Sequence, residues 1–464
     1  MQNGVKEVHF IGVCGTAMGA VAAAMANRGW NVTGSDANCY PPMSDILDKS
    51  GIGLRQGYSP ANIPENCPLV VVGNAMSRGN PELEEVLTRK MEYVSLPEAL
   101  RRFFLVGKHN YVVCGTHGKT TTTSMLAWLL ESAGRNPGYL IGGVPRNFPA
   151  GARFTESAEM VLEGDEYDTA FFDKRSKFLH YLPEVVVMNN IEFDHADIFK
   201  NLDEIKLSFS RLLRVVPTTG LVIINADDAN CCDVARDALA PVVRVGFSQD
   251  SNHRIEDVEE RPGFASFRLG DFRFTVPMNG MFNVRNAAMA VVAARRAGLD
   301  DSTIQSGLAG FLGVGRRQEL RGEVRGVKVV DDFAHHPTAI ALAVQSMRQR
   351  YPGGRVWVIF EPRSNTTRRN IFQNDLVSAL LHADRVVVSC VEDPGKVAEA
   401  ERLDPCRLVQ DVCDGGVEAW LESGADAIVA RVVPLAQPGD VLLVVSNGGF
   451  GGIHQKLLTA LENS

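Results

Sequence analysis

The chain has 464 residues, which exceeds one ordinary domain and predicts about three, each large enough to bury its own core. Its 47 Lys and Arg against 55 Asp and Glu give a formal net charge of −8. This balance argues against a general nucleic-acid binder, because such proteins neutralise phosphates with an excess of basic residues. The 45% hydrophobic and 22% charged residues are typical of a globular protein and exclude a disordered or collagen-like one.

No apolar run approaches the roughly 20 residues that a membrane-spanning helix needs, and the N-terminal residues run directly into an expected strand. The nine cysteines are scattered without a CxxC pair, which favours reduced thiols. We therefore expect a soluble cytoplasmic protein with neither a nucleic-acid nor a membrane partner. The sequence leaves the oligomeric state open.

The predicted elements alternate between short apolar strands and helices in three successive units. The first unit, 1–108, indicates a small parallel sheet with crossover helices. The second, 109–318, opens with a strand, a glycine-rich turn and a helix, and contains polar hairpins around 251–274. The third, 319–464, has short β-branched strands separated by helices. The expected fold class is α/β, with three consecutive αβ domains.

The clearest motif is the glycine-rich turn in residues 112–121, VVCGTHGKTT. A buried strand ends there and a helix begins at Lys119, so backbone N–H groups and the positive end of the helix face any bound oxyanion. Lys119 adds a charge for the β- and γ-phosphates, and the Thr120 hydroxyl is a ligand for Mg²⁺. The spacing, GxxGKT, is two residues shorter than the usual GxxxxGKT, and a purely structural turn would not need Lys and Thr together. We predict that a nucleoside triphosphate binds Gly115, Thr116, His117, Gly118, Lys119, Thr120 and Thr121.

Acidic residues follow two later strands of the same unit, at 163–166 and at 192–195, where a histidine joins them. The carboxyl ends of parallel strands meet at one edge of a sheet, beside the phosphate loop. Either group alone is more typical of a solvated turn. Their convergence with the loop predicts a site for a metal ion and a phosphate.

A second glycine-rich loop, Gly12, Gly15 and Gly19, follows the first strand and opens a helix. Its spacing, GxxGxxxG, matches the dinucleotide motif GxGxxG only in part. Ser35 and Asp36 end the next strand, where an acid commonly meets a ribose hydroxyl. NAD and a nucleotide diphosphate sugar both fit this pattern, and glycines that only allow close packing remain the alternative.

Taken together, these residues resemble the Mur ligase family, ATP-dependent amide-forming enzymes. The resemblance covers essentially the whole chain and is carried by GTHGKTTTT, EGDEYD, NNIEFDHADIF, FNVRNAA, GRRQELRGE and VDDFAHHP. It implies a Rossmann-like domain that binds a UDP-sugar at 1–108, a central P-loop ATP-binding domain at 109–318, and a Rossmann-like domain that accepts the amine at 319–464. The implied UDP-sugar contacts are Gly12, Gly15, Gly19, Ser35, Asp36 and Asn74.

The same resemblance implies the roles of individual residues around ATP. Lys119, Glu163, His195 and Arg317 would be catalytic, and Thr120, Glu163 and His195 would hold Mg²⁺. Asn283, Asn286, Arg317 and Asp331 match positions around the nucleotide, with Arg317 at the phosphates and Asp331 at the ribose. The structural alternatives to nucleotide binding are a helix-terminal turn for the Asn pair and a surface ion pair for Arg317. His335 and His336 either assist the attacking amine or cap a helix that starts at Pro337.

Within the family, five further stretches are similar to enzymes that act in peptidoglycan recycling. Those enzymes join the murein tripeptide L-alanyl-γ-D-glutamyl-meso-diaminopimelate to UDP-N-acetylmuramate through an acyl phosphate. The stretches are SDANCYPPMS, GNAMSRGNP, EYDTAFFDKRSKF, EPRSNT and SNGGFGGIHQKL. Members that add free L-alanine in peptidoglycan synthesis are the alternative. A tripeptide brings several carboxylates, so cations should line its pocket. The candidates are Arg363, Ser364 and Asn365 on one loop and Lys174 and Arg175 on another, where a solvated basic run is the alternative.

Two functions from other classes also remain. The first glycine loop permits a nicotinamide oxidoreductase, although its glycine spacing and the Lys119–Thr120 pair argue against it. A non-catalytic, nucleotide-gated binding module is the other, although the metal-site residues are complete.

Overall fold

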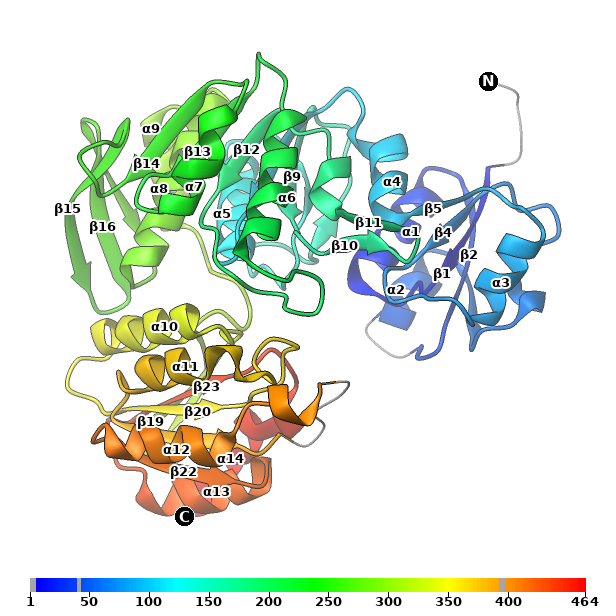
Figure 1. The fold of residues 1–464 in the computed structure, drawn as a ribbon. Helices are drawn as coiled ribbons and strands as arrows, with labels where there is room; N and C mark the ends of the chain where they lie inside the picture. Colours follow the sequence, from blue (N-terminus) through cyan, green and yellow to red (C-terminus); the bar gives the residue numbers. More distant parts are fainter. Residues whose placement is uncertain (1–5, 40–42, 392–396) are drawn as a thin grey trace.

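The computed structural model describes residues 6–39, 43–391 and 397–464. It contains three αβ units in chain order. In the view of Figure 1 the first unit (blue) lies to the right of the central unit (cyan to green), and the third unit (yellow to red) lies below the central one. The predicted α/β class with three consecutive domains is confirmed. Residues 40–42 of the SDANCYPPMS stretch lie outside the described residues.

The first unit is a five-stranded parallel sheet in the order β3-β2-β1-β4-β5. Val8, Phe10 and Ile11 of the central strand are fully buried, because helices cover both faces of a parallel sheet. The elements are β1 (Glu7–Ile11), α1 (Thr16–Asn27), β2 (Asn31–Asp36), α2 (Met43–Lys49), β3 (Gly53–Gln56), β4 (Val70–Val72), α3 (Pro81–Thr88), β5 (Tyr93–Ser95) and α4 (Leu96–Leu100).

The central unit is built on a ten-stranded sheet in the order β17-β16-β15-β14-β13-β12-β6-β9-β7-β8. The expected hairpins are confirmed as antiparallel β15, β16 and β17, which extend the parallel part of the sheet. The strands are β6 (His109–Cys114), β7 (Gly138–Leu140), β8 (Ala152–Arg153), β9 (Glu159–Gly164), β12 (Val185–Met188), β13 (Leu221–Asn225), β14 (Val242–Gly246), β15 (His253–Arg261), β16 (Phe264–Leu269) and β17 (Phe272–Val276). A separate hairpin joins β10 (Asp168–Ala170) to β11 (Asp173–Ser176).

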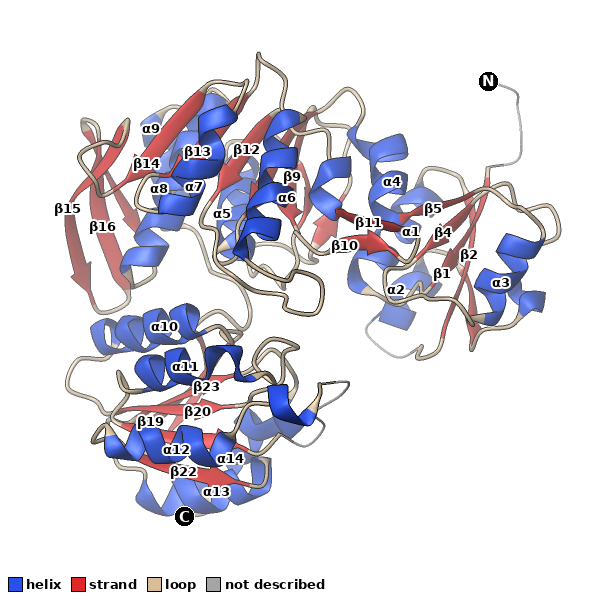
Figure 2. Cartoon of the chain, in the orientation of Figure 1, coloured by secondary structure: helices blue, strands red, loops and turns tan. Residues whose placement is uncertain are grey.

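Helices cover both faces of the central sheet (Figure 2). Alternate residues of the buried strands point to opposite faces, so Val113 packs with α5 and α8 while Val112 and Cys114 pack on the side of α6. The helices are α5 (Lys119–Ser132), α6 (Leu202–Arg214), α7 (Ala229–Val234), α8 (Met281–Arg296) and α9 (Asp301–Ala309).

The third unit has a six-stranded sheet in the order β18-β19-β23-β20-β21-β22, parallel except for β18. Helices α10 to α12 pack on one face, and α13 and α14 on the other. The elements are β18 (Glu319–Val324), β19 (Val327–Asp332), α10 (Pro337–Arg350), β20 (Val356–Phe360), α11 (Gln373–Leu380), β21 (Arg385–Ser389), α12 (Pro405–Asp414), β22 (Glu418–Glu422), α13 (Ala425–Val432), β23 (Val441–Val445) and α14 (Ile453–Glu462). Among the described residues, no helix is both long and apolar enough to cross a bilayer.

A buried carboxylate anchors the end of β2 in the first unit. Glu82 of α3 is fully buried and accepts hydrogen bonds from the Asn62 amide at 2.6 Å, the Ser59 N–H at 3.1 Å and the Ser35 hydroxyl. Removing it would leave these donors without partners, a cost of about 1–3 kcal/mol for a buried group.

We predict that Glu82→Ala weakens the protection of the β1 and β2 amides in native-state hydrogen exchange by about 2 kcal/mol. Glu84→Ala on the same helix removes an exposed ion pair with Arg78 and a hydrogen bond from the Gly79 N–H, neither of which touches β1 or β2, and should leave those amides unchanged. Equal protection in Glu82→Ala and the original protein would contradict the assigned role.

Candidate active site

The phosphate loop links β6 to α5 and has a conformation that requires glycine. Gly115 and Gly118 adopt φ angles of +126° and +79°, in the left-handed region that other residues avoid. A Cβ on Gly118 would lie 2.6 Å from the Asn286 Oδ1 atom, and one on Gly115 would lie 2.8 Å from the Asn190 carbonyl oxygen. Glycine is therefore needed at both positions, because it lets the loop at the start of α5 pack closely against Asn190 and Asn286.

Hydrogen bonds join the phosphate loop to the segment that follows β12. The Thr116 N–H donates to the Asn190 carbonyl at 3.0 Å, and the His117 N–H donates to the Asn190 Oδ1 atom at 2.7 Å. The Glu192 N–H donates to the Thr116 hydroxyl at 2.8 Å. The sequence pattern assigned no role to Asn190, although it lies in the NNIEFDHADIF stretch that pointed to this site.

Lys119 and His195 share one buried carboxylate. Lys119 Nζ lies 2.9 Å from the Glu166 Oε2 atom, and His195 Nε2 lies 3.0 Å from the Glu166 Oε1 atom. Burial alone would raise the pKa of Glu166, but the two cations outweigh it and lower that pKa. Glu166 belongs to the acidic stretch after β9, but the sequence pattern did not distinguish it from Glu163.

Thr120 and Glu163 form an oxygen-rich corner beside the loop. The Thr120 hydroxyl donates to Glu163 Oε1 at 2.9 Å, and the Gly142 N–H donates to the other oxygen at 2.6 Å. A Cβ on Gly142 would lie 2.9 Å from Glu163, and one on Gly143 the same distance from Thr120, so glycines keep this corner open. Adjacent hydroxyl and carboxylate oxygens are the donors that Mg²⁺ prefers, so these residues fit that ion. The predicted ligand His195 contacts Glu166.

Arg317 reaches the same corner from the connection to the third unit. Its Nη2 atom lies 3.3 Å from the Thr120 Oγ1 atom, and its guanidinium carbon lies 4.8 Å from the centre of the Phe333 ring. The structure thus brings Arg317 to the end of the phosphate loop, and its expected contact with the phosphates stays a prediction. It also brings the buried Asn286 of α8 against Gly118, while buried Asn283 bonds to the Asn279 carbonyl at 2.8 Å.

Asp331 lies at the end of β19 and contacts one basic residue of the third unit, His454, and one of the connection that leads into it, Arg316. Its carboxylate is 3.4 Å from the Arg316 Nε atom and 3.3 Å from the His454 Nε2 atom. Burial on its own would raise the pKa of Asp331, but the contacts with His454 and Arg316 have the larger effect, so the pKa is lowered. Its contacts are therefore with Arg316 and His454, and its expected role at the ribose stays a prediction.

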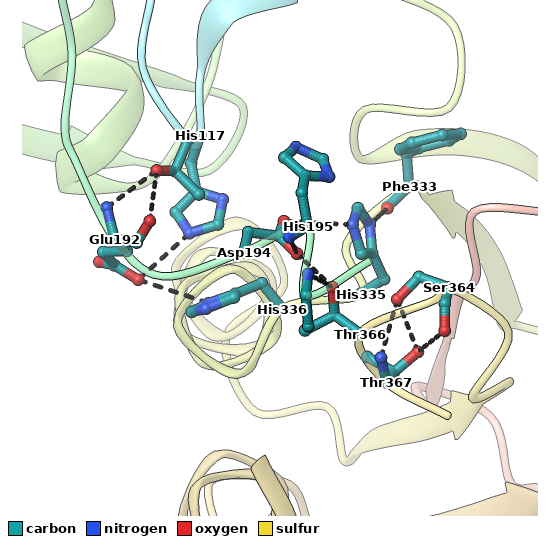
Figure 3. A network of polar contacts seen from close by, with 12 residues as sticks. His117, Glu192, Asp194, His195, Phe333, His335, His336, Ser364, Thr366 and Thr367 are labelled. Atoms are coloured by element: carbon teal, nitrogen blue, oxygen red, sulfur yellow. Dashed lines mark hydrogen bonds and ion pairs between the residues drawn. The ribbon is translucent and has the colours of Figure 1, made fainter. Parts of the chain in front are cut away.

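The segment 190–197 contacts the third unit (Figure 3). The Thr366 hydroxyl donates to Asp194 Oδ1 at 2.8 Å, and the Asn365 amide donates to Asp197 Oδ2 at 2.9 Å. The Thr338 hydroxyl donates to Glu192 Oε2 at 2.7 Å. These bonds hold the third unit against the phosphate-loop side of the central unit.

His336 caps α10, as one of the two sequence-based interpretations expected. Its Nδ1 atom accepts the Thr338 N–H at 3.3 Å, at the N-cap position before Pro337. Burial and the neighbouring His117 lower the pKa of His336 to about 4, which keeps its imidazole neutral. His335 instead bonds through Nδ1 to the Phe333 carbonyl at 3.0 Å.

The two cation groups expected at the peptide lie on different units. Arg363 is half exposed, at 3.7 Å from Glu361, and packs so closely on Gly448 that a Cβ there would overlap it. Its neighbour Ser364 bonds to Thr367 at 2.8 Å within the same loop.

Lys174 and Arg175 lie on the β10–β11 hairpin of the central unit, and each is paired locally. The Lys174 ammonium is 2.6 Å from Asp168, and the Arg175 guanidinium is 2.7 Å from Asp173. Both side chains are largely exposed, which matches the solvated alternative; their expected peptide contact stays a prediction.

The first glycine loop is tied to the end of β2. Gly12 has φ +85° and its N–H donates to the Ser35 carbonyl at 2.8 Å, while Asp36 accepts the Cys14 N–H at 2.9 Å. Gly15 caps α1, and a Cβ on Gly19 would overlap Met43 of α2. The Ser35 hydroxyl donates its hydrogen bond to Glu82. Asn74 lies after β4 and is exposed to solvent.

Comparison with known proteins gives the same family for all three units. Residues 7–106 match the Mur ligase family catalytic domain, 113–294 the Mur ligase middle domain, and 316–448 the glutamate ligase domain of Mur ligases.

Individual relatives match along the whole chain. The chain is 42% identical, over 98% of each sequence, to UDP-N-acetylmuramate–L-alanyl-γ-D-glutamyl-meso-2,6-diaminoheptandioate ligase of Escherichia coli (strain K12). It is 31% identical to UDP-N-acetylmuramate–L-alanine ligase of Geobacter sp. (strain M21), over 100% of this chain and 99% of the relative. The crystal structure of a murein peptide ligase from Psychrobacter arcticus 273-4 aligns with TM-score 0.72 and 36% identity over 99% of each chain. The chain belongs to the Mur ligase family of ATP-dependent, amide-forming ligases.

Proposed function

We propose that this protein joins the tripeptide L-alanyl-γ-D-glutamyl-meso-diaminopimelate to the carboxylate of UDP-N-acetylmuramate, at the expense of ATP. The observation that carries the proposal is the approach of Arg317 to Thr120, at the end of a glycine loop that also bears Lys119. The choice of acceptor is supported by the higher identity to the Escherichia coli tripeptide ligase, 42%, than to the L-alanine ligase of Geobacter, 31%.

The first step makes the sugar carboxylate reactive. A carboxylate is a poor electrophile because its leaving group would be an oxide, whereas an acyl phosphate loses phosphate readily. Transfer of the γ-phosphoryl group depends mainly on positioning and on stabilisation of charge. Lys119, which precedes Thr120 in the chain, and Arg317, 3.3 Å from the Thr120 hydroxyl, would supply that charge. The corner formed by Thr120 and Glu163 would hold Mg²⁺, with His195 as the third ligand implied by the family resemblance, and Mg²⁺ neutralises phosphate charge when bound.

The second step is attack by the amine of the peptide. An α-amino group has a pKa of about 7.7–8.0, so a fair fraction is neutral near pH 7 without a strong base. Water competes for the acyl phosphate, and the contacts of Thr366 with Asp194 and of Asn365 with Asp197 would keep the third unit closed over the site. The exposed guanidinium of Arg363 is the cation that we assign to a peptide carboxylate.

The first unit would hold the UDP-sugar. The loop at Gly12 and Gly15 would take a diphosphate next to the start of α1, and Asp36 at the end of β2, which accepts the Cys14 N–H, would meet a ribose hydroxyl. The unit assignments 1–108 for the UDP-sugar, 109–318 for ATP and 319–464 for the peptide are part of this proposal.

We predict that Lys119→Ala lowers kcat for ADP release at least about 100-fold, because it removes a charge aimed at the transferred phosphoryl group. Binding of UDP-N-acetylmuramate, measured by calorimetry, should be unchanged. Lys456→Ala, on the surface of α14, is the matched control and should keep full turnover. Turnover of Lys119→Ala within a few-fold of the original would contradict the assigned role.

The acceptor is tested by ADP release with Mg²⁺, ATP and UDP-N-acetylmuramate in the presence of either the tripeptide or free L-alanine. We expect kcat/KM to be at least about 100-fold higher with the tripeptide, because cations placed for extra carboxylates are left unpaired by the smaller acceptor. A preference for L-alanine would instead support the alternative ligase of peptidoglycan synthesis.

A further inference from the structure

Three side chains with metal-binding chemistry meet between the central and third units, away from the Thr120–Glu163 corner. His117 comes from the phosphate loop, Glu192 from the segment after β12, and His336 from the N-cap of α10 (Figure 3). One ligand atom from each lies within 4.8 Å of the others. His117 is also predicted to bind the nucleotide and His336 caps α10, but neither the family comparison nor the proposed reaction places a metal ion among the three residues.

The spacing of these atoms suits one shared ion. His117 Nε2 lies 3.2 Å and His336 Nδ1 lies 3.4 Å from the same oxygen of Glu192, Oε2. Ligands about 2.0–2.1 Å from a tetrahedral Zn²⁺ ion are separated from one another by about 3.3–3.4 Å. Both distances to Glu192 match that separation, and the two imidazole nitrogens lie within 4.8 Å of each other, so a small shift of one ring would complete the set around a single ion.

Neighbouring groups orient the ligands as they do in metal sites. His336 Nε2 faces the Phe193 carbonyl at 3.2 Å and must donate to it, since a carbonyl oxygen only accepts. Nδ1 then carries the lone pair, which accepts the Thr338 N–H at 3.3 Å and lies 3.4 Å from Glu192 Oε2; an ion bound at Nδ1 would replace the Thr338 N–H as its partner. The Thr338 hydroxyl donates to Glu192 at 2.7 Å and fixes its carboxylate. A histidine whose second nitrogen donates to a carbonyl, beside a hydrogen-bonded carboxylate, is the usual outer arrangement of a metal centre.

The group is reachable from outside. A cavity of about 400 Å³, lined by Glu192, His336, Thr338 and Phe372 among others, lies against it. The side chain of His117 is 17% exposed and that of Glu192 is 31% exposed, so an ion could enter and keep a water as its fourth ligand.

We propose that His117, Glu192 and His336 bind a divalent transition-metal ion of the zinc class, which cross-links the central and third units. Two imidazole nitrogens and one carboxylate suit Zn²⁺, whereas Mg²⁺ prefers the all-oxygen corner at Thr120 and Glu163. The site is thus chemically distinct from the one assigned to the reaction, and the proposal does not depend on the acceptor or on turnover.

The test is titration of the purified full-length protein with Zn²⁺ in excess Mg²⁺, followed by competition with a chromogenic chelator. We expect one tight equivalent in the original protein. His336→Asn should weaken it by more than about 100-fold, since losing a ligand costs more than the 10–100-fold typical of an outer-shell partner. Asn is a good N-cap residue, so α10 keeps its start. His335→Asn, the neighbouring histidine, is the matched control and should bind as the original does.

Two further variants distinguish Zn²⁺ binding at this group from Zn²⁺ binding at the oxygen corner. Thr338→Val removes only the hydrogen bond to Glu192 and should weaken Zn²⁺ binding about 10–100-fold. Glu163→Gln alters the oxygen corner and should leave the tight equivalent intact. Co²⁺ substituted for Zn²⁺ should give the strong visible absorption of tetrahedral coordination, absent in His336→Asn. Absence of a tight equivalent, equal binding in His336→Asn, or its loss in Glu163→Gln would overturn the proposal.

Discussion

The active site depends on one buried carboxylate. Glu166 is almost wholly excluded from solvent, and its two oxygens are taken by the Lys119 ammonium and the His195 imidazole. A buried charge without partners is very costly, and breaking such a pair by removing one member typically costs about 3–5 kcal/mol. The same carboxylate therefore fixes a residue of the phosphate loop and a residue of the segment after β12, and thereby sets the position of one against the other.

The rest of the site is assembled around that pair by backbone geometry. Parallel strands β6, β9 and β12 lie side by side, so their carboxyl ends place the glycine loop, Glu163 and the 189–195 segment at one edge of the sheet. The connection to the third unit reaches this edge through Arg317, and the third unit itself reaches it through Thr366. Chemistry that uses a water-sensitive intermediate needs such closure, and it is made here by hydrogen bonds to the loop side of the central unit.

Much of the fold and of the phosphate loop could be predicted from the sequence, because some motifs adopt the same local conformation in any fold. The strand–glycine–helix turn before Lys119, the hairpins around 251–274 and the αβ alternation are of this kind. Thr120 beside Glu163 also followed, since Glu163 lies at the end of β9 and Thr120 follows the loop at the end of the neighbouring strand β6.

Partner choice among close neighbours could not be predicted, because it depends on side-chain direction in the folded chain. Nothing in the EGDE stretch indicates that His195 contacts Glu166, three residues beyond Glu163. The local pairing of Lys174 with Asp168 depends on the register of a short hairpin, and the meeting of His117 with His336 depends on how two units dock.

The central claim is that the loop before Lys119 positions ATP to phosphorylate a sugar carboxylate. The most direct measurement uses UDP-N-acetylmuramate labelled with oxygen-18 in both carboxylate oxygens, and follows the label during turnover with the tripeptide. An acyl phosphate breaks at its carbonyl carbon when the amine attacks, so each phosphate released should carry one labelled oxygen. Release of unlabelled phosphate alongside amide formation would contradict the account.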